Sequence, residues 1–120
     1  MKNRVLICDD AAIMRLAIKD VLTRNGYEIV GEACNGREAV MLYDSLKPDL
    51  VFMDITMPEQ DGVSALKEIK KTDPSARVIM CAAMGQSSLA AEAIQAGAAD
   101  FIIKPVSGAR LLETAKQALK

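Results

Sequence analysis

The sequence predicts an α/β protein: a doubly wound, flavodoxin-like parallel sheet of five strands in the order 2-1-3-4-5, with five helices. Short apolar segments rich in β-branched residues alternate along the chain with segments of helical period. Three of the apolar segments are nearly continuous, which is typical of strands covered on both faces of a parallel sheet. Glycine or proline stands at most joins, and right-handed crossovers between the βα units make the strands parallel.

The expected strands are short segments in which apolar and β-branched residues dominate. In chain order they are 4–8 (RVLIC), 28–33 (EIVGEA), 49–54 (DLVFMD), 77–82 (RVIMCA) and 100–104 (DFIIK). Cys8 and Cys81 lie at the ends of two of these segments. Because the chain has no CxxC pattern and no histidine, we interpret both as small buried hydrophobic residues rather than as metal ligands or nucleophiles.

A helical period in the apolar positions marks the segment after each strand. The expected helices are 12–24, 37–46, 63–72, 87–96 and 108–119. Asp10 directly precedes the first of them and, taken alone, would be interpreted as its N-cap. Asp61-Gly62 is predicted to form a turn.

Composition excludes several classes of function. The net charge is −1, with 15 basic and 16 acidic residues interspersed, so the chain lacks the basic footprint of a nucleic-acid-binding protein. No apolar segment approaches the ~20 residues that a membrane span needs, and the N-terminal one is too short for a signal peptide. We therefore expect one cytoplasmic, monomeric domain over residues 1–120.

Charged residues follow three of the expected strands. Asp9 and Asp10 come directly after the first, Asp54 ends the third, and Lys104 ends the fifth. Because ligands of such folds bind at the shared carboxyl edge, near the switch point between strands 1 and 3, we expect these four side chains to meet in one cleft. Three carboxylates close together repel one another, and hard oxygen ligands without histidine or aligned thiolates favour Mg²⁺ or Mn²⁺.

Such a cleft suits phosphoryl transfer, because protein-bound Mg²⁺ keeps sites for water and for phosphate oxygens. A carboxylate can act as the nucleophile and form an aspartyl phosphate. Asp54 is the best-placed candidate. Asp10 is expected to hold the metal with help from Asp9, and Lys104 to neutralise charge on the phosphoryl oxygens.

Four motifs together resemble one known family. They are DD at 9–10, MDITMPEQDG at 53–62, AMGQ at 83–86 and DFIIKP at 100–105. In this combination the chain is similar to the receiver domain of two-component response regulators, and the likeness extends over all five βα units.

The resemblance implies a phosphoacceptor protein rather than a conventional enzyme. Asp54 would accept a phosphoryl group from a histidine kinase, and Lys104 would contact that group. The Lys104-Pro105 peptide bond would be cis. Asp10, Asp54 and the backbone carbonyl of Thr56 would bind Mg²⁺, with Asp9 nearby. The face formed by the fourth helix, fifth strand and fifth helix would bind a partner protein, in chemotaxis the flagellar motor switch.

One position departs from the family pattern. Receivers usually carry Ser or Thr at the end of the fourth strand, where this chain has Ala82. In the family, that hydroxyl bonds a phosphoryl oxygen and draws an aromatic residue inward, which here would be Phe101. The net free energy of such a hydrogen bond is about 1 kcal/mol or more. We expect phosphorylation to survive its loss and coupling to the partner face to weaken. Ser87 and Ser88 are expected to open the fourth helix rather than replace the hydroxyl.

The residues alone are also compatible with other functions. A chemotaxis regulator, a phosphate sink, a phosphorelay intermediate and a receiver made insensitive to phosphate by Ala82 would share these site residues. An aspartate-nucleophile phosphatase usually carries DxD and an added cap segment, whereas this chain has adjacent aspartates and no spare length. In an FMN-binding protein, Asp9 and Asp10 would repel the phosphate.

Thr56 and Met84 flank the expected site and would tune the lifetime of an aspartyl phosphate.

Overall fold

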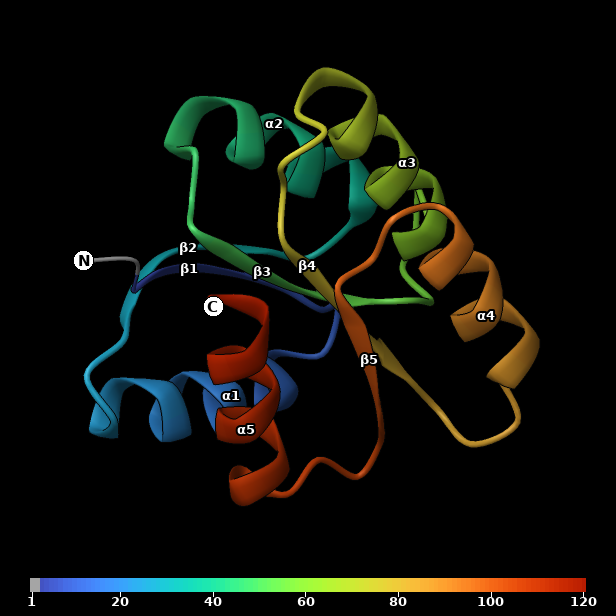
Figure 1. Ribbon diagram of the computed structural model, residues 1–120. Helices are drawn as coiled ribbons and strands as arrows, with labels where there is room; N and C mark the ends of the chain where they lie inside the picture. Colours follow the sequence, from blue (N-terminus) through green and yellow to red (C-terminus); the bar gives the residue numbers. More distant parts are fainter. Residues whose placement is uncertain (1–2) are drawn as a thin grey trace.

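The computed structural model describes residues 3–120 as one five-stranded parallel sheet (Figure 1). The strands are β1 (Arg4–Cys8), β2 (Glu28–Ala33), β3 (Leu50–Asp54), β4 (Val78–Ala82) and β5 (Asp100–Ile103). They lie in the order β2-β1-β3-β4-β5, and each pair of neighbours is parallel. The predicted fold class and strand order are confirmed.

Five helices cover the two faces of the sheet (Figure 1). They are α1 (Ala12–Arg24), α2 (Gly36–Leu46), α3 (Gly62–Thr72), α4 (Ser87–Gln95) and α5 (Gly108–Ala118). The helices α1 and α5 pack on one face, and α2, α3 and α4 pack on the other. Their starts and ends agree with the sequence-based ranges to within one residue.

The sheet separates two apolar cores. Side chains alternate along β3, so that Phe52 packs beneath α1 and α5 while Met53 packs beneath α2, α3 and α4. Both β3 and β4 are buried along their full length, as their continuous apolar sequences predict. Cys8 and Cys81 are each 1% exposed within these cores, and burial raises the pKa of both thiols. The interpretation of both cysteines as buried hydrophobic residues is confirmed.

The start of α3 packs directly against the end of β3. Asp61 is the N-cap of α3, and its carboxylate accepts a hydrogen bond from the backbone N–H of Ser64 at 2.8 Å. The prediction of a turn at Asp61-Gly62 is therefore wrong. A Cβ on Gly62 would lie 1.9 Å from the backbone oxygen of Asp54, so only glycine fits against this strand end.

The start of α1 also differs from the simplest interpretation of the sequence. Ala11, not Asp10, occupies the N-cap position. The Asp9 carboxylate accepts the Ala11 N–H at 2.9 Å, because the chain turns sharply between β1 and α1. The Asp10 side chain is exposed and remains available at the edge of the sheet.

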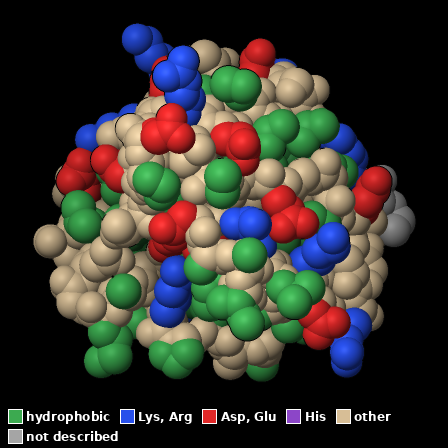
Figure 2. All heavy atoms as spheres, turned by 180° about the vertical axis from the view of Figure 1, so that it is seen from behind, with side chains coloured by type: hydrophobic (Ala, Val, Ile, Leu, Met, Phe, Trp, Pro, Cys, Tyr) green, Lys and Arg blue, Asp and Glu red, His purple; other side chains and the backbone are tan. Residues whose placement is uncertain are grey.

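The surface carries charges of both signs. On the face shown in Figure 2, basic and acidic side chains are interspersed with small hydrophobic groups rather than gathered by sign. Across residues 3–120, no helix has the length and apolar character that crossing a membrane requires.

Candidate functional site

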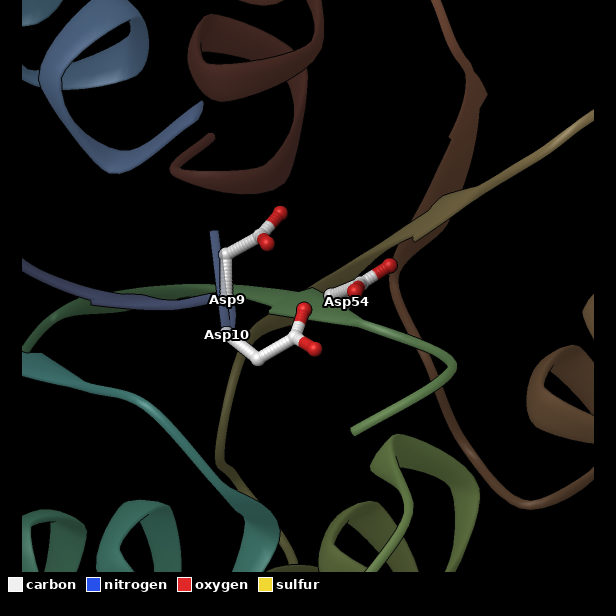
Figure 3. Close-up of side chains that lie close together, drawn as sticks. All are labelled: Asp9, Asp10 and Asp54. Carbon is white, nitrogen blue, oxygen red and sulfur yellow. The ribbon is translucent and has the colours of Figure 1, made fainter. Parts of the chain in front are cut away.

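Three carboxylates converge at the carboxyl edge of the sheet. Because β1 and β3 are neighbours, with Cys8 opposite Met53, the residues that follow Cys8 lie beside Asp54. Figure 3 shows the side chains of Asp9, Asp10 and Asp54 extending toward the same side from the ends of these two strands. One oxygen from each carboxylate lies within 4.8 Å of the others. The topology thus brings together the three acidic residues that the sequence singles out.

Lys104 reaches this cluster from the end of β5. Its Nζ lies 3.1 Å from Oδ2 of Asp9 and 3.1 Å from Oδ1 of Asp54. Its backbone N–H donates to the carbonyl of Ala82 at 2.8 Å, and this hydrogen bond fixes the position of the Lys104 backbone beside β4. The ammonium group therefore bridges two carboxylates that are 1% and 6% exposed.

Burial and charge act in opposite directions on these groups. Burial raises the pKa of Asp54, a hydrogen bond from Lys104 opposes it, and the charges of Asp9 and Asp10 add to the rise; the net direction is upward. Burial alone would lower the pKa of Lys104, but its hydrogen bonds and ion pairs with Asp54 and Asp9 raise it overall. One ammonium among three carboxylates leaves an excess of negative charge at this edge.

Asp9 is held from several sides. Besides accepting the Ala11 N–H through its carboxylate, it accepts a hydrogen bond from Nη1 of Arg15 through its backbone carbonyl, at 2.7 Å. Arg15 also pairs with Glu32 on β2 at 3.1 Å. Arg15 was not among the predicted site residues, although a basic residue near the start of a helix opposes the helix dipole and is a recognisable signal.

The donor set fits a magnesium ion. Its ligand atoms are hard carboxylate oxygens with an excess of negative charge, and Mg²⁺ is bound through one or two carboxylates while keeping several waters. Thr56 lies two residues beyond Asp54, and the role of its carbonyl stays a prediction.

The residues of the expected switch lie beside this site. Ala82 is fully buried at the end of β4, and Phe101 on β5 is half-buried and packs against the same apolar core. The peptide bond between Lys104 and Pro105 is cis, as expected. Ser87 is the first residue of α4, so the expectation that Ser87 and Ser88 open this helix is confirmed.

Gln86 makes a polar contact beside the site that was not predicted from the sequence. Nε2 of Gln86 donates to Oγ1 of Thr56 at 2.7 Å, and Oε1 of Gln86 accepts the N–H of Ala83 at 2.7 Å. The contact with Thr56, thirty residues away, has no sequence signal.

Comparisons with known proteins agree with this geometry. The family described as "Response regulator receiver domain" matches residues 5–116. The chain is 57% identical to the chemotaxis protein CheY of Thermotoga maritima over the full length of both, and 59% identical to CheY of Bacillus subtilis over 99% of both. Among solved structures, a chain of the CheX-CheY-BeF₃-Mg²⁺ complex from Borrelia burgdorferi superposes with a TM-score of 0.93 at 35% identity, covering 98% of this chain and 89% of that one.

Proposed function

The chain belongs to the response regulator receiver family of two-component signalling, and from this premise we propose that Asp54 is its phosphoacceptor. The chain is a homologue of the CheY chemotaxis response regulators, and residues 1–120 would act as a single receiver domain. The observation that carries the proposal is the position of Asp54: it ends a buried central strand, 3.1 Å from the ammonium group of Lys104 and beside the carboxylates of Asp9 and Asp10.

In the proposed reaction, a carboxylate oxygen of Asp54 attacks the phosphorus of a phosphohistidine on a histidine kinase. The new O–P bond forms as the P–N bond breaks, and the electron pair of that bond stays on the imidazole nitrogen. The Asp54 carboxylate must be ionised to attack, and the ammonium group 3.1 Å from its Oδ1 favours the ionised form against the effect of burial.

Lys104 then acts as a point charge beside the phosphoryl oxygens, because its Nζ lies 3.1 Å from Oδ1 of Asp54, the side chain that would bear the phosphoryl group. Asp10, Asp54 and the Thr56 carbonyl would hold Mg²⁺, with Asp9 behind them. A bound Mg²⁺ would supply positive charge to the carboxylates and to the phosphoryl oxygens. Chemistry at this site would be limited to accepting the phosphoryl group and losing it to water.

The proposed output surface is the face formed by α4, β5 and α5. Leu89, Ile94 and Ile103 expose large apolar side chains on α4 and on the edge strand β5, as a docking surface requires. The occupant would be the flagellar motor switch or another signalling protein. The Borrelia burgdorferi comparison, in which CheY forms a complex with the protein CheX, supports a protein as the partner.

Intact mass spectrometry after incubation with acetyl phosphate and Mg²⁺ tests the proposal. The wild-type protein should gain the mass of a single phosphoryl group, and the Asp54→Asn variant should gain none. Equal labelling of both proteins would assign the phosphoacceptor elsewhere. Many turnovers of a small phosphate ester per protein molecule would instead indicate a phosphatase.

A further inference from the structure

The side chain of Gln86 connects the loops that follow β3 and β4. Its carboxamide donates to the Thr56 hydroxyl oxygen and accepts the Ala83 N–H, each at 2.7 Å. Gln86 is also the N-cap residue of α4. An N-cap side chain ordinarily bonds the N–H groups of its own helix, whereas this one bridges two loops beside Asp54.

The direction of the Ala83 N–H follows from the alternation of β4. The carbonyl of Cys81 accepts the N–H of Ile55 on the β3 side at 3.0 Å, and the carbonyl of Ala82 accepts the N–H of Lys104 on the β5 side at 2.8 Å. Because successive residues of a strand present their polar groups to opposite neighbours, the N–H of Ala83 points back to the β3 side. That is the side on which Asp54 ends its strand.

The partner that a continued ladder would offer Ala83 is already engaged. The carbonyl of Ile55 accepts the N–H of Gly62 at 2.7 Å, where α3 begins. Oε1 of Gln86 takes the place of that carbonyl and satisfies the Ala83 N–H. A donor aimed at the neighbourhood of Asp54 is thus occupied by a side chain that can move, not by the backbone.

We propose that Gln86 is a positioning residue of the phosphoryl site, whose carboxamide holds the Ala83 N–H in the unmodified protein and releases it to a phosphoryl oxygen on Asp54. The inference rests on the proposed phosphorylation of Asp54. A charged phosphoryl oxygen is a stronger acceptor than a neutral carboxamide, so the exchange is favourable. Because Gln86 is the N-cap residue of α4, its release carries the change at Asp54 to this helix. In this chain Ala82 has no hydroxyl that could do so.

Binding of beryllofluoride with Mg²⁺, a mimic of the phosphoryl group, tests the role of Gln86. The Gln86→Met variant keeps the length of the side chain and removes both hydrogen bonds. Because it no longer competes for the Ala83 N–H, it should bind the mimic about fivefold more tightly than wild type, the factor that one net hydrogen bond carries. Ser88→Ala, on the exposed first turn of α4, is the matched control and should bind as wild type does. Asp54→Asn should not bind.

Nuclear magnetic resonance of the wild-type protein gives a second readout. The Gln86 side-chain NH₂ should exchange slowly with solvent in the free protein and rapidly once beryllofluoride is bound, while the Ala83 N–H stays protected. Binding that requires Asp54 but leaves the Gln86 signals and the affinity of Gln86→Met unchanged would overturn the inference and leave the proposed function intact. Absence of any binding by the wild-type protein would contradict the proposed function, and with it this inference.

Discussion

Nζ of Lys104 lies 3.1 Å from Oδ1 of Asp54, so a side chain that directly follows the edge strand β5 reaches across β4 to the end of β3. The same ammonium group also contacts Asp9 at 3.1 Å. Two nearly buried carboxylates therefore share one cation. Because the ammonium group offsets the repulsion between these carboxylates, the stability of the fold depends on Lys104.

Replacing Lys104 with Met should lower the free energy of unfolding by about 3 kcal/mol at neutral pH, because it leaves two buried carboxylates without their partner. The loss should shrink as the pH falls and the carboxyl groups become protonated. Urea unfolding at several pH values measures both effects. Lys116→Met, at an exposed position of α5, is the control and should change stability by less than about 0.5 kcal/mol. Equal losses in the two variants would contradict the prediction.

Replacing Asp54 with Asn should raise the free energy of unfolding by roughly 1 kcal/mol at neutral pH, since it removes the ionised form that burial disfavours. The pKa of Asp54 in the folded protein lies above its ordinary value of 3.8, so the folded state binds the proton more tightly than the unfolded state does. This contribution to stability is fully present below pH 3.8 and is lost as the pH rises through the folded-state pKa.

The difference between Asp54→Asn and wild type should therefore be small near pH 3.8 and should grow as the pH rises. Thermal or urea unfolding of both proteins across that range checks the sign. A difference that does not change with pH would show that the ionisation of Asp54 is not its cause.

Replacing Gly62 with Ala should destabilise the protein by about 3 kcal/mol or more, because a Cβ would overlap the Asp54 backbone oxygen and neither α3 nor β3 can move freely. Gly26→Ala is the control. It also sits in a tight connection, with φ of +89° but open space around it, and should cost only about 1–2 kcal/mol of backbone strain. Comparable losses in the two variants would mean that close contact at Asp54 is unimportant.

Replacing Ala82 with Ser should strengthen the coupling between Asp54 and the partner face. We expect beryllofluoride to raise the affinity of the wild-type protein for a motor-switch peptide by less than about tenfold. For Ala82→Ser we expect a gain about fivefold larger, the factor that one net hydrogen bond of about 1 kcal/mol carries. Fluorescence anisotropy of a labelled peptide measures both gains. A gain of about a hundredfold in the wild type would contradict the expected weakening.

The fold and the convergence of the carboxylates could be predicted because both depend on topology alone. Alternating apolar and helical segments fix a parallel sheet, and such a sheet brings the residues after β1 and β3 to one edge. No side-chain conformation is needed to conclude that Asp9, Asp10 and Asp54 are neighbours. The cis peptide bond between Lys104 and Pro105 was predicted from the family resemblance alone, because no pattern in the residues indicates it.

The details that escaped prediction depend on local competition or on side-chain rotamers. Asp61-Gly62 has the sequence of a turn and equally that of a helix N-cap, and only the approach of α3 to Asp54 decides for the cap. The bridge from Gln86 to Thr56 joins side chains thirty residues apart, and periodicity says nothing about such a pair.

Isothermal titration with Mg²⁺ tests the central claim, that Asp9, Asp10 and Asp54 form a site for a divalent cation. We expect one ion to bind per molecule of the wild-type protein and the affinity to fall about tenfold or more in Asp10→Asn and in Asp54→Asn. Asp44→Asn, at an exposed position of α2, should bind as wild type does. Absence of magnesium binding by the wild-type protein, or equal binding by all four proteins, would contradict the account.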